Sequence, residues 1–347
     1  MKRRILLVLA LVVLAGLVTA VTVIAVIRGE IDRTIDVPGT TMVEVSPGQS
    51  LHLVAARLRE AGLIGSERVF LTAAWWKGVD RAIKHGRHEF HGNVSLATIL
   101  EELSRAPRPI LRVTIPEGLT LREIGTLLEF SGAVSAESYA AVACSEEFRR
   151  LVDAPPEAQC AEGYLFPDTY DLVPGMSPGK VVDLQARRFR DVVDPLLAEA
   201  GPEAAPELNT APDGRVGRLL TLASIVEKET GQAAERPRIA SVFYNRLRIG
   251  MPLQTDPTVI YGVIDSGMPW DGNLTRVHLK TPTPYNTYTR KGLPPAPICN
   301  PGRASLEAVL RPATGSDLYF VARGDGSHEF SRNLTDHNRA VRRYQLR

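Results

Sequence analysis

Two glutamates, Glu227 and Glu229, stand at the C-terminal end of an apolar stretch with helical spacing. At about 100° per residue, Glu229 falls beside Leu222 and Val226, and Glu227 falls at the opposite border of the same apolar stripe. Gly231 is expected to end this helix. A half-buried glutamate with no partner in its own turn suits general acid catalysis, because burial raises the pKa of a carboxyl group. The alternative is a solvated helix end, which this segment alone favours.

Two later segments are rich in neutral hydrogen-bonding side chains. Residues 251–262 place a polar cluster before Val-Ile-Tyr and are expected to form a loop that leads into a strand. Residues 282–302 carry six prolines, which stiffen a loop, and their side chains suit sugar hydroxyls and amides better than phosphate. The candidate substrate-binding residues are Gln254, Asp256, Thr258, Tyr285, Asn286 and Asn300. For each of them taken singly, a role in turn and loop structure is the equal alternative.

Regular elements flank these segments and must hold them in place. The apolar spacing predicts helices over residues 235–247 and 303–310, a hairpin over 318–331 with Gly-Asp-Gly at its turn, and a closing helix over 334–345. Residues 162–172 mix aromatic side chains with turn formers, which is a weak indication of a carbohydrate cleft. Residues 199–216 are expected to form a surface loop. The pattern as a whole predicts an α+β domain over residues 107–347, which holds the candidate catalytic and substrate-binding residues.

The N-terminus predicts a membrane anchor. Residues 5–27 carry no charged side chain, and such a run is long enough to cross a hydrocarbon core of about 30 Å. The basic residues 1–4 predict that the N-terminus stays in the cytoplasm and that the rest lies outside the plasma (inner) membrane, in the periplasmic or extracytoplasmic space. A cleaved signal peptide is the rival interpretation, although its apolar core is normally shorter. We therefore expect an N-terminal tail and transmembrane helix over residues 1–30, followed by a linker over 31–41.

A small αβ subdomain is expected over residues 42–106. Its predicted order of strand, helix, helix and strand is similar to LysM domains, which bind aminosugar glycans. Trp75 and Trp76 are candidates for stacking on sugar rings, with a place in the core as the alternative. The strand, Pro-Gly turn and helix of residues 43–62 recur at residues 113–132, which indicates a duplicated unit.

Composition excludes several classes of function. A formal net charge of +2 over 347 residues, without a long basic run in the folded part, argues against a nucleic-acid partner. The cysteines Cys144, Cys160 and Cys299 have no zinc-finger spacing, and His328 and His337 lack a third ligand at suitable spacing. In an oxidising compartment Cys144 is expected to pair with Cys160, the alternative being three free buried cysteines.

Several motifs together resemble one known family. They are ASIVEKET at residues 223–230, VFYNRLRIGMPLQTDPTVIYG at 242–262, PYNTYTRKGLPPAPICNPG at 284–302, YFVARGDGSHEF at 319–330 and DHNRAV at 336–341. The chain resembles the endolytic murein transglycosylases, the MltG/YceG-like proteins, over nearly its whole length. The resemblance implies cleavage between N-acetylmuramic acid and N-acetylglucosamine within peptidoglycan glycan strands, leaving a 1,6-anhydro end. It implies no metal and no cofactor. Because a membrane anchor restricts reach, we expect nascent strands near the bilayer as substrates, with cell-wall synthases as candidate partners.

One carboxyl group is sufficient for that chemistry. It protonates the glycosidic oxygen and then accepts the proton of the sugar's own C6 hydroxyl, which closes on C1 in place of water. We assign this role to Glu229, because Glu229-Thr230 is similar to the Glu-Ser pair of other lytic transglycosylases, and Glu227 is the second choice. Asp256 at about 5 to 9 Å from Glu229 would favour two-carboxylate hydrolysis instead. The rival function is a non-catalytic, membrane-anchored glycan-binding scaffold.

Overall fold

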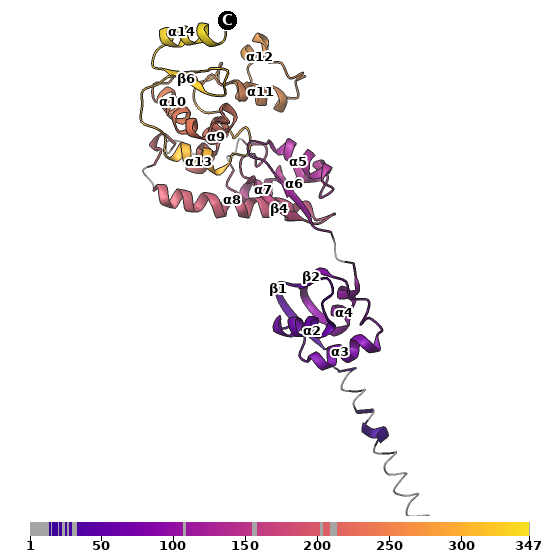
Figure 1. The fold of residues 1–347 in the computed structure, drawn as a ribbon. Coiled ribbons are helices and arrows are strands. Elements are labelled where there is room, and N and C mark those ends of the chain that lie inside the picture. Colours follow the sequence, from indigo (N-terminus) through magenta and orange to yellow (C-terminus); the bar gives the residue numbers. More distant parts are fainter. Residues whose placement is uncertain are drawn as a thin grey trace, which may run out of the picture. The chain divides into compact units, whose positions relative to one another are not determined.

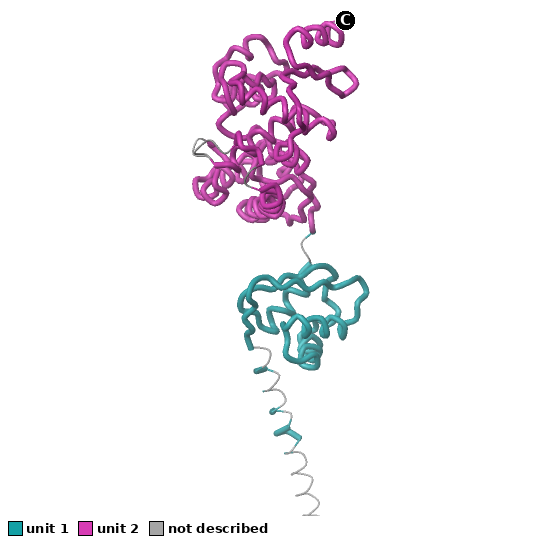
Figure 2. Tube along the Cα trace, turned by 90° about the vertical axis from the view of Figure 1, so that its left-hand side faces the viewer, with its two compact units in different colours: residues 1–109 teal, residues 110–347 magenta. Residues whose placement is uncertain are grey.

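The structure is a computed structural model that describes residues 14, 16–19, 21, 22, 25, 28, 29, 33–106, 109–154, 158–201, 204–208 and 214–346. Most of the expected anchor, residues 5–27, lies outside the described residues. Among the residues that are described, no helix is long and apolar enough to cross a membrane. The chain divides into two compact units, residues 1–109 and 110–347, which Figure 2 colours separately.

The first unit has the predicted order of strand, helix, helix and strand. It consists of β1 (Thr34–Val45), α2 (Leu51–Glu60), α3 (Glu67–Trp76), β2 (Gly86–Ser95) and α4 (Leu96–Ser104). The strands β1 and β2 pair antiparallel from Thr34 opposite Ser95 to Val45 opposite Gly86, with an irregularity between Val37 and Thr40. The similarity to LysM domains stays a prediction.

The linker expected over residues 31–41 is wrong from Thr34 onward, because this segment is the first part of β1. The turn-forming Pro38 and Gly39 suggested a linker, but they fall at the irregularity of the β1–β2 pairing and do not end the strand. Trp75 and Trp76 are 74% and 50% exposed, so neither belongs to the core of this unit.

The second unit is a mixed α+β structure, as the sequence predicted. Its first half contains β3 (Leu111–Thr114), α5 (Leu121–Phe130), α6 (Ala136–Ala143), α7 (Glu146–Leu151), β4 (Thr169–Leu172) and α8 (Pro178–Ala200). Its second half contains α9 (Gly214–Glu229), α10 (Arg236–Arg248), α11 (Asp256–Asp265), α12 (Arg276–Lys280), α13 (Arg303–Leu310), β5 (Tyr319–Ala322), β6 (His328–Ser331) and α14 (Leu334–Tyr344). The helices and the hairpin expected after residue 231 are confirmed, and Figure 1 shows their arrangement.

The repeated strand, turn and helix are present in both units, as β1 with α2 and as β3 with α5. Both helices begin at a hydroxyl residue: Ser50 caps α2, and Thr120 caps α5 in a capping box with Glu123. In the second unit, the strand β3 pairs antiparallel with β4. A short capped helix after a turn that contains proline and glycine is therefore the element that the sequence repeats.

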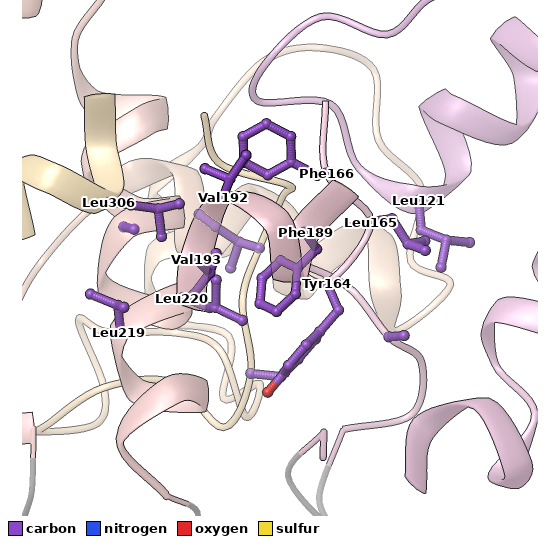
Figure 3. Close-up of a cluster of buried hydrophobic side chains, with 14 of the residues drawn as sticks. Leu121, Tyr164, Leu165, Phe166, Phe189, Val192, Val193, Leu219, Leu220 and Leu306 are labelled. Carbon is purple, nitrogen blue, oxygen red and sulfur yellow. The ribbon is translucent and has the colours of Figure 1, made fainter. Parts of the chain in front are cut away.

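The apolar face of α9 is the centre of the second unit's core. Leu219 and Leu220 of α9 lie in one cluster with Phe189 and Val193 of α8 and with Leu306 of α13 (Figure 3). Each of these side chains is at most 6% exposed. Because α9 is packed along its length, its last residues are held by the body of the domain and not by a loop.

Two expectations for this unit are corrected. The expected strand at Val259–Tyr261 is part of the helix α11, because Thr255 provides an extended first residue and Pro257 is tolerated in the first helical turn, where its missing N–H would have no partner. The loop expected over residues 199–216 is shorter, since α8 continues to Ala200 and α9 begins at Gly214. The pairing of Cys144 with Cys160 in a disulfide is confirmed.

Candidate active site

Glu229 is the last residue of α9 and the candidate general acid. Its carboxyl group is only partly exposed, while Val226 one turn earlier and Leu222 two turns earlier are fully buried. Burial raises the pKa of Glu229 to about 7, and the nearby charge of Asp256 adds to the rise. The Thr255 side chain, His328 and Arg246 act in the opposite direction. A carboxyl group with this pKa is close to half protonated at neutral pH, which is what a group that must both give and take a proton requires.

Arg246 of α10 fixes the surroundings of Glu229. Its Nε donates to the Leu318 carbonyl at 2.7 Å and its Nη1 donates to the Leu253 carbonyl at 2.6 Å. Its guanidinium lies over the Tyr319 ring, 5.3 Å from the ring centre. One cation thus joins α10 to the start of the hairpin and to the loop before α11, and its positive charge favours the ionised form of Glu229.

The hairpin β5–β6 supplies His328, whose orientation is set by Glu235. The His328 Nδ1 lies 2.7 Å from Glu235 Oε2, and the backbone N–H of His328 donates to Glu235 Oε1 at 2.9 Å. A carboxylate on Nδ1 holds one ring nitrogen and leaves Nε2 to face other groups. His337, the other candidate histidine, stacks on Tyr319 with ring centres 5.1 Å apart.

Glu227 has a different environment from Glu229. Its carboxylate accepts a hydrogen bond from Arg236 at 2.9 Å and another from the backbone N–H of Gly302 at 3.0 Å, and its side chain is 7% exposed. The Glu117 carboxylate lies against Gly302, where a Cβ atom would collide with it. Burial and the charge of Glu227 raise the pKa of Glu117. This arrangement ties the Pro-x-Gly turn of the second repeat and the start of α13 to the end of α9.

Gln254 and Asp256 lie on either side of Thr255 and are both exposed. Gln254 has a φ of +49°, a conformation that side chains other than glycine rarely adopt. The Tyr288 hydroxyl donates to Asp256 Oδ1 at 2.6 Å. These two predicted substrate-binding residues therefore flank Thr255, the residue before α11, whose side chain works against the rise in the pKa of Glu229.

The structure does not bring the other four predicted residues to Glu229 in an exposed position. Thr258, Asn286 and Asn300 are fully buried, and their side chains bond to the protein. Thr258 bonds to Thr255 O and Thr287 Oγ1, whereas the Asn286 amide donates to carbonyl groups of residues 278–281. Tyr285 packs against Tyr261, with ring centres 4.7 Å apart.

Asn300 forms a hydrogen bond to Glu162, a buried residue that was not selected from the sequence. Glu162 accepts hydrogen bonds from the Leu121 N–H at 2.9 Å and from Asn300 Nδ2 at 2.7 Å. Burial raises its pKa to about 8, although these bonds work against the rise. The aromatic residues around Glu162 were the only local signal in the sequence, and they gave no indication of its burial.

The third cysteine, Cys299, has a structural role. Cys299 is buried and its Sγ donates to the Ser224 carbonyl, so it fastens the 282–302 loop to α9. Within the described part of the chain, no three His, Cys, Asp or Glu side chains are grouped so that they could hold a metal ion.

Comparison with known proteins identifies what the chain is similar to. The model of the YceG-like family matches residues 43–343. An endolytic murein transglycosylase of Bacillus subtilis is 32% identical over 319 residues, which cover 88% of this chain and 85% of that protein. One of Streptococcus pneumoniae is 28% identical over 86% of this chain and 57% of its own length. A crystal structure of a YceG-like protein from Listeria monocytogenes superimposes with a TM-score of 0.57 at 27% identity, over 87% of this chain and 99% of that one.

Proposed function

The chain belongs to the YceG-like family, and from this membership we propose that it is an endolytic murein transglycosylase. Its substrate is the glycan strand of peptidoglycan, which it cleaves between N-acetylmuramic acid and N-acetylglucosamine. The product carries a 1,6-anhydro end. The desolvated, partly exposed Glu229 carboxyl at the end of a rigid helix carries this assignment.

Glu229 acts first as an acid. With a pKa of about 7 it holds a proton in a large fraction of molecules at neutral pH, and it gives that proton to the glycosidic oxygen as the bond to C1 breaks. The bond breaks through an oxocarbenium-like state with positive charge on the ring. The exposed Asp256 carboxylate beside this position stabilises that charge, and Arg246 and His328 stabilise the ionised Glu229 that remains.

Glu229 then acts as a base. The carboxylate accepts the proton of the C6 hydroxyl, and the C6 oxygen forms a bond to C1, which closes the anhydro ring and returns the proton to Glu229. No water is consumed, so one carboxyl group completes the cycle. Gln254 and Asp256 position the sugar, because they are the exposed polar residues of the loop next to Glu229.

The remaining parts of the chain place this activity at the membrane. We propose that residues 5–27 anchor the protein in the plasma membrane with residues 31 onward outside the cytoplasm, and that the first unit is a LysM-like module next to that membrane. The disulfide Cys144–Cys160 supports an oxidising compartment. An anchor limits reach, so the substrates are nascent strands near the bilayer, where cell-wall synthases work.

Incubation of the full chain in detergent with un-crosslinked glycan strands tests this function. Fragments with 1,6-anhydro ends, lighter than hydrolysis products by the mass of one water, are the expected result. Fragments with reducing ends would show two-carboxylate hydrolysis with Asp256 as the second group. Retention of intact strands without any cleavage would show a glycan-binding scaffold instead.

A further inference from the structure

The second unit contains a cavity that is lined by residues other than those of the candidate active site. It has a volume of about 670 Å³ and lies in the second unit, between the start of α5, the disulfide of α6, and one face of α11. This volume is within the range of roughly 300 to 1,000 Å³ that is usual for pockets that enclose a small ligand. None of the residues assigned above to proton transfer or sugar positioning lines it.

The cavity is next to the candidate active site. Lys228 of α9 and Pro257 of α11 are among its lining residues, and each is the chain neighbour of a site residue, Glu229 and Asp256 respectively. Neighbouring residues are about 3.8 Å apart at their Cα atoms. The cavity therefore touches both α9 and α11 at the position next to a site residue.

The walls of the cavity are aliphatic. Leu121, Ile260, Ile264 and Ile298 line it together with the disulfide. Glu162 lies at the wall as well, fully buried and held by the Leu121 N–H and by Asn300. Because its pKa is raised to about 8, Glu162 is mainly uncharged at neutral pH and adds no fixed negative charge to the aliphatic wall.

The lining also includes four exposed charged side chains, Arg122, Glu123, Lys228 and Asp265. Arg122 of α5 and Asp265 of α11 are both exposed, and the charge of Arg122 works against the rise in the pKa of Asp265 that burial causes. In the described part of the chain, neither of them forms an ion pair within 4.0 Å. A cation and an anion that are separated across an aliphatic cavity match a ligand with a carboxylate, an amino group and small apolar side chains.

We propose that this cavity, the stem pocket, binds the peptide stem of the muramic acid residue at the cleaved bond. The inference rests on the proposed function, since the stem is attached at C3 of the same ring whose C1 reacts. The stem is a short peptide of alanines, an acidic residue and a diamino residue. Its methyl groups pack on Ile260 and Ile264, its carboxylates lie towards Arg122, and its amino group lies towards Asp265. The stem pocket thus selects strands that still carry peptides.

Two substrates test this selection with the full chain in detergent. One is a glycan strand with its stems, and the other is the same strand after an amidase has removed them. We expect a kcat/KM about tenfold higher on the strand with stems, a size of discrimination that apolar pockets reach. Equal cleavage of both strands would overturn the stem pocket and leave the proposed function intact, whereas no cleavage of either strand would overturn the proposed function.

Variants locate the effect in the stem pocket. Ile264→Trp fills the cavity and should bring the ratio of the two kcat/KM values close to one. Ile249→Trp is the matched control, because Ile249 is 61% exposed at the end of α10 and does not line the cavity, so the ratio should stay near ten. Asp265→Lys is a second pocket variant at an exposed position where folding is not at risk, and it should also reduce the ratio.

Binding of a free stem pentapeptide gives a readout that does not depend on cleavage. In NMR titrations of the full chain, the free peptide should bind. Because Glu229 does not line the cavity, Glu229→Gln should bind the peptide with the same affinity as the wild type. Ile264→Trp should weaken this binding at least tenfold. A peptide that does not bind, or that binds equally to Ile264→Trp, would overturn the stem pocket.

Discussion

The Glu227 carboxylate accepts a hydrogen bond from the Arg236 guanidinium at 2.9 Å, and both groups are nearly buried. Among the described residues, Glu229, two residues further on, forms no ion pair with an arginine within 4.0 Å, and burial raises its pKa to about 7. The two glutamates therefore differ in environment: Glu227 is bonded to a buried guanidinium and a backbone N–H, while burial raises the pKa of Glu229 so that it can carry a proton. This difference is the physical reason for assigning the chemistry to Glu229.

Glu229→Gln should abolish strand cleavage, with a loss of about a thousandfold or more, because an amide cannot donate the proton that the leaving oxygen needs. The fold should remain, since glutamine has the same shape and removes a desolvated acid. Activity on glycan strands and the melting temperature are the measurements. Full activity of the purified variant would return the role to Glu227.

Glu227→Gln is the matched control for that variant. It leaves Arg236 buried without its anion and weakens the bond to Gly302, so the free energy of unfolding should fall by about 3 kcal/mol. Cleavage by the folded fraction should continue. A variant of unchanged stability without activity would contradict the structural role of Glu227.

Helical spacing was sufficient to place Glu229 at the border of a buried stripe, but it could not reveal the partner of Glu227. Arg236 lies on the next helix, and its side chain returns to α9 only through the packing of α10. The helices expected over residues 235–247 and 303–310 were confirmed, because their apolar spacing is a local signal. The strand expected before residue 262 was wrong, because the segment around Pro257 forms the first turn of a helix. A proline after a polar cluster is compatible with a strand or with the first turn of a helix, and tertiary packing decides between them.

For the residues of the 282–302 loop, the sequence could not show which side chains are buried. Asn286 and Asn300 were selected as sugar-binding because amides suit hydroxyl groups, yet both are fully buried and bond to backbone groups. Amides in a proline-rich loop have many unpaired backbone groups close by, and a single sequence cannot show which of the two uses applies. Glu162 was missed because its burial depends on residues 121 and 300, which are far away in the chain.

The pH dependence of cleavage should follow the protonation of Glu229. The acid step needs the protonated form, so kcat/KM should fall as the pH rises through about 7. The charge of Asp256 contributes to the raised pKa, and Asp256→Asn should therefore move this alkaline limb to lower pH. Asp271→Asn, at an exposed position outside the site, should leave the limb where it is in the wild type. A limb that stays in place in Asp256→Asn would remove Asp256 from the neighbourhood of the acid.

Glu162 should make stability depend on pH. Its folded pKa of about 8 lies above the ordinary value of 4.5, so the folded state binds the proton more tightly than the unfolded state does. The resulting stabilisation is full below pH 4.5 and is lost as the pH rises through about 8. Urea unfolding should give a free energy lower at pH 9 than at pH 6 by an amount on the order of a few kcal/mol. Glu162→Gln should reduce this difference, and an equal difference in both proteins would assign it to other groups.

The disulfide Cys144–Cys160 should stabilise the second unit. It closes a loop with a sequence separation of 16, for which loop-closure entropy predicts about 3 kcal/mol. Reductant should lower the melting temperature of the wild type but not that of the double variant Cys144→Ala/Cys160→Ala. The remaining cysteine, Cys299, is a free thiol in both proteins, so it cannot account for the difference. A reductant effect of equal size in the double variant would argue against the bond.

Gln254→Gly should separate stability from binding. At a φ of +49° the backbone is strained for glutamine and relaxed for glycine, so the variant should gain up to about 1 kcal/mol of stability. It also removes an exposed amide from the loop beside Glu229, and if that amide holds the sugar, KM should rise several-fold with little change in the alkaline pKa of the rate profile. Gln254→Ala is the matched control, since it removes the same amide without the relief of strain. A protein that gains stability and keeps its KM would reduce Gln254 to a turn residue.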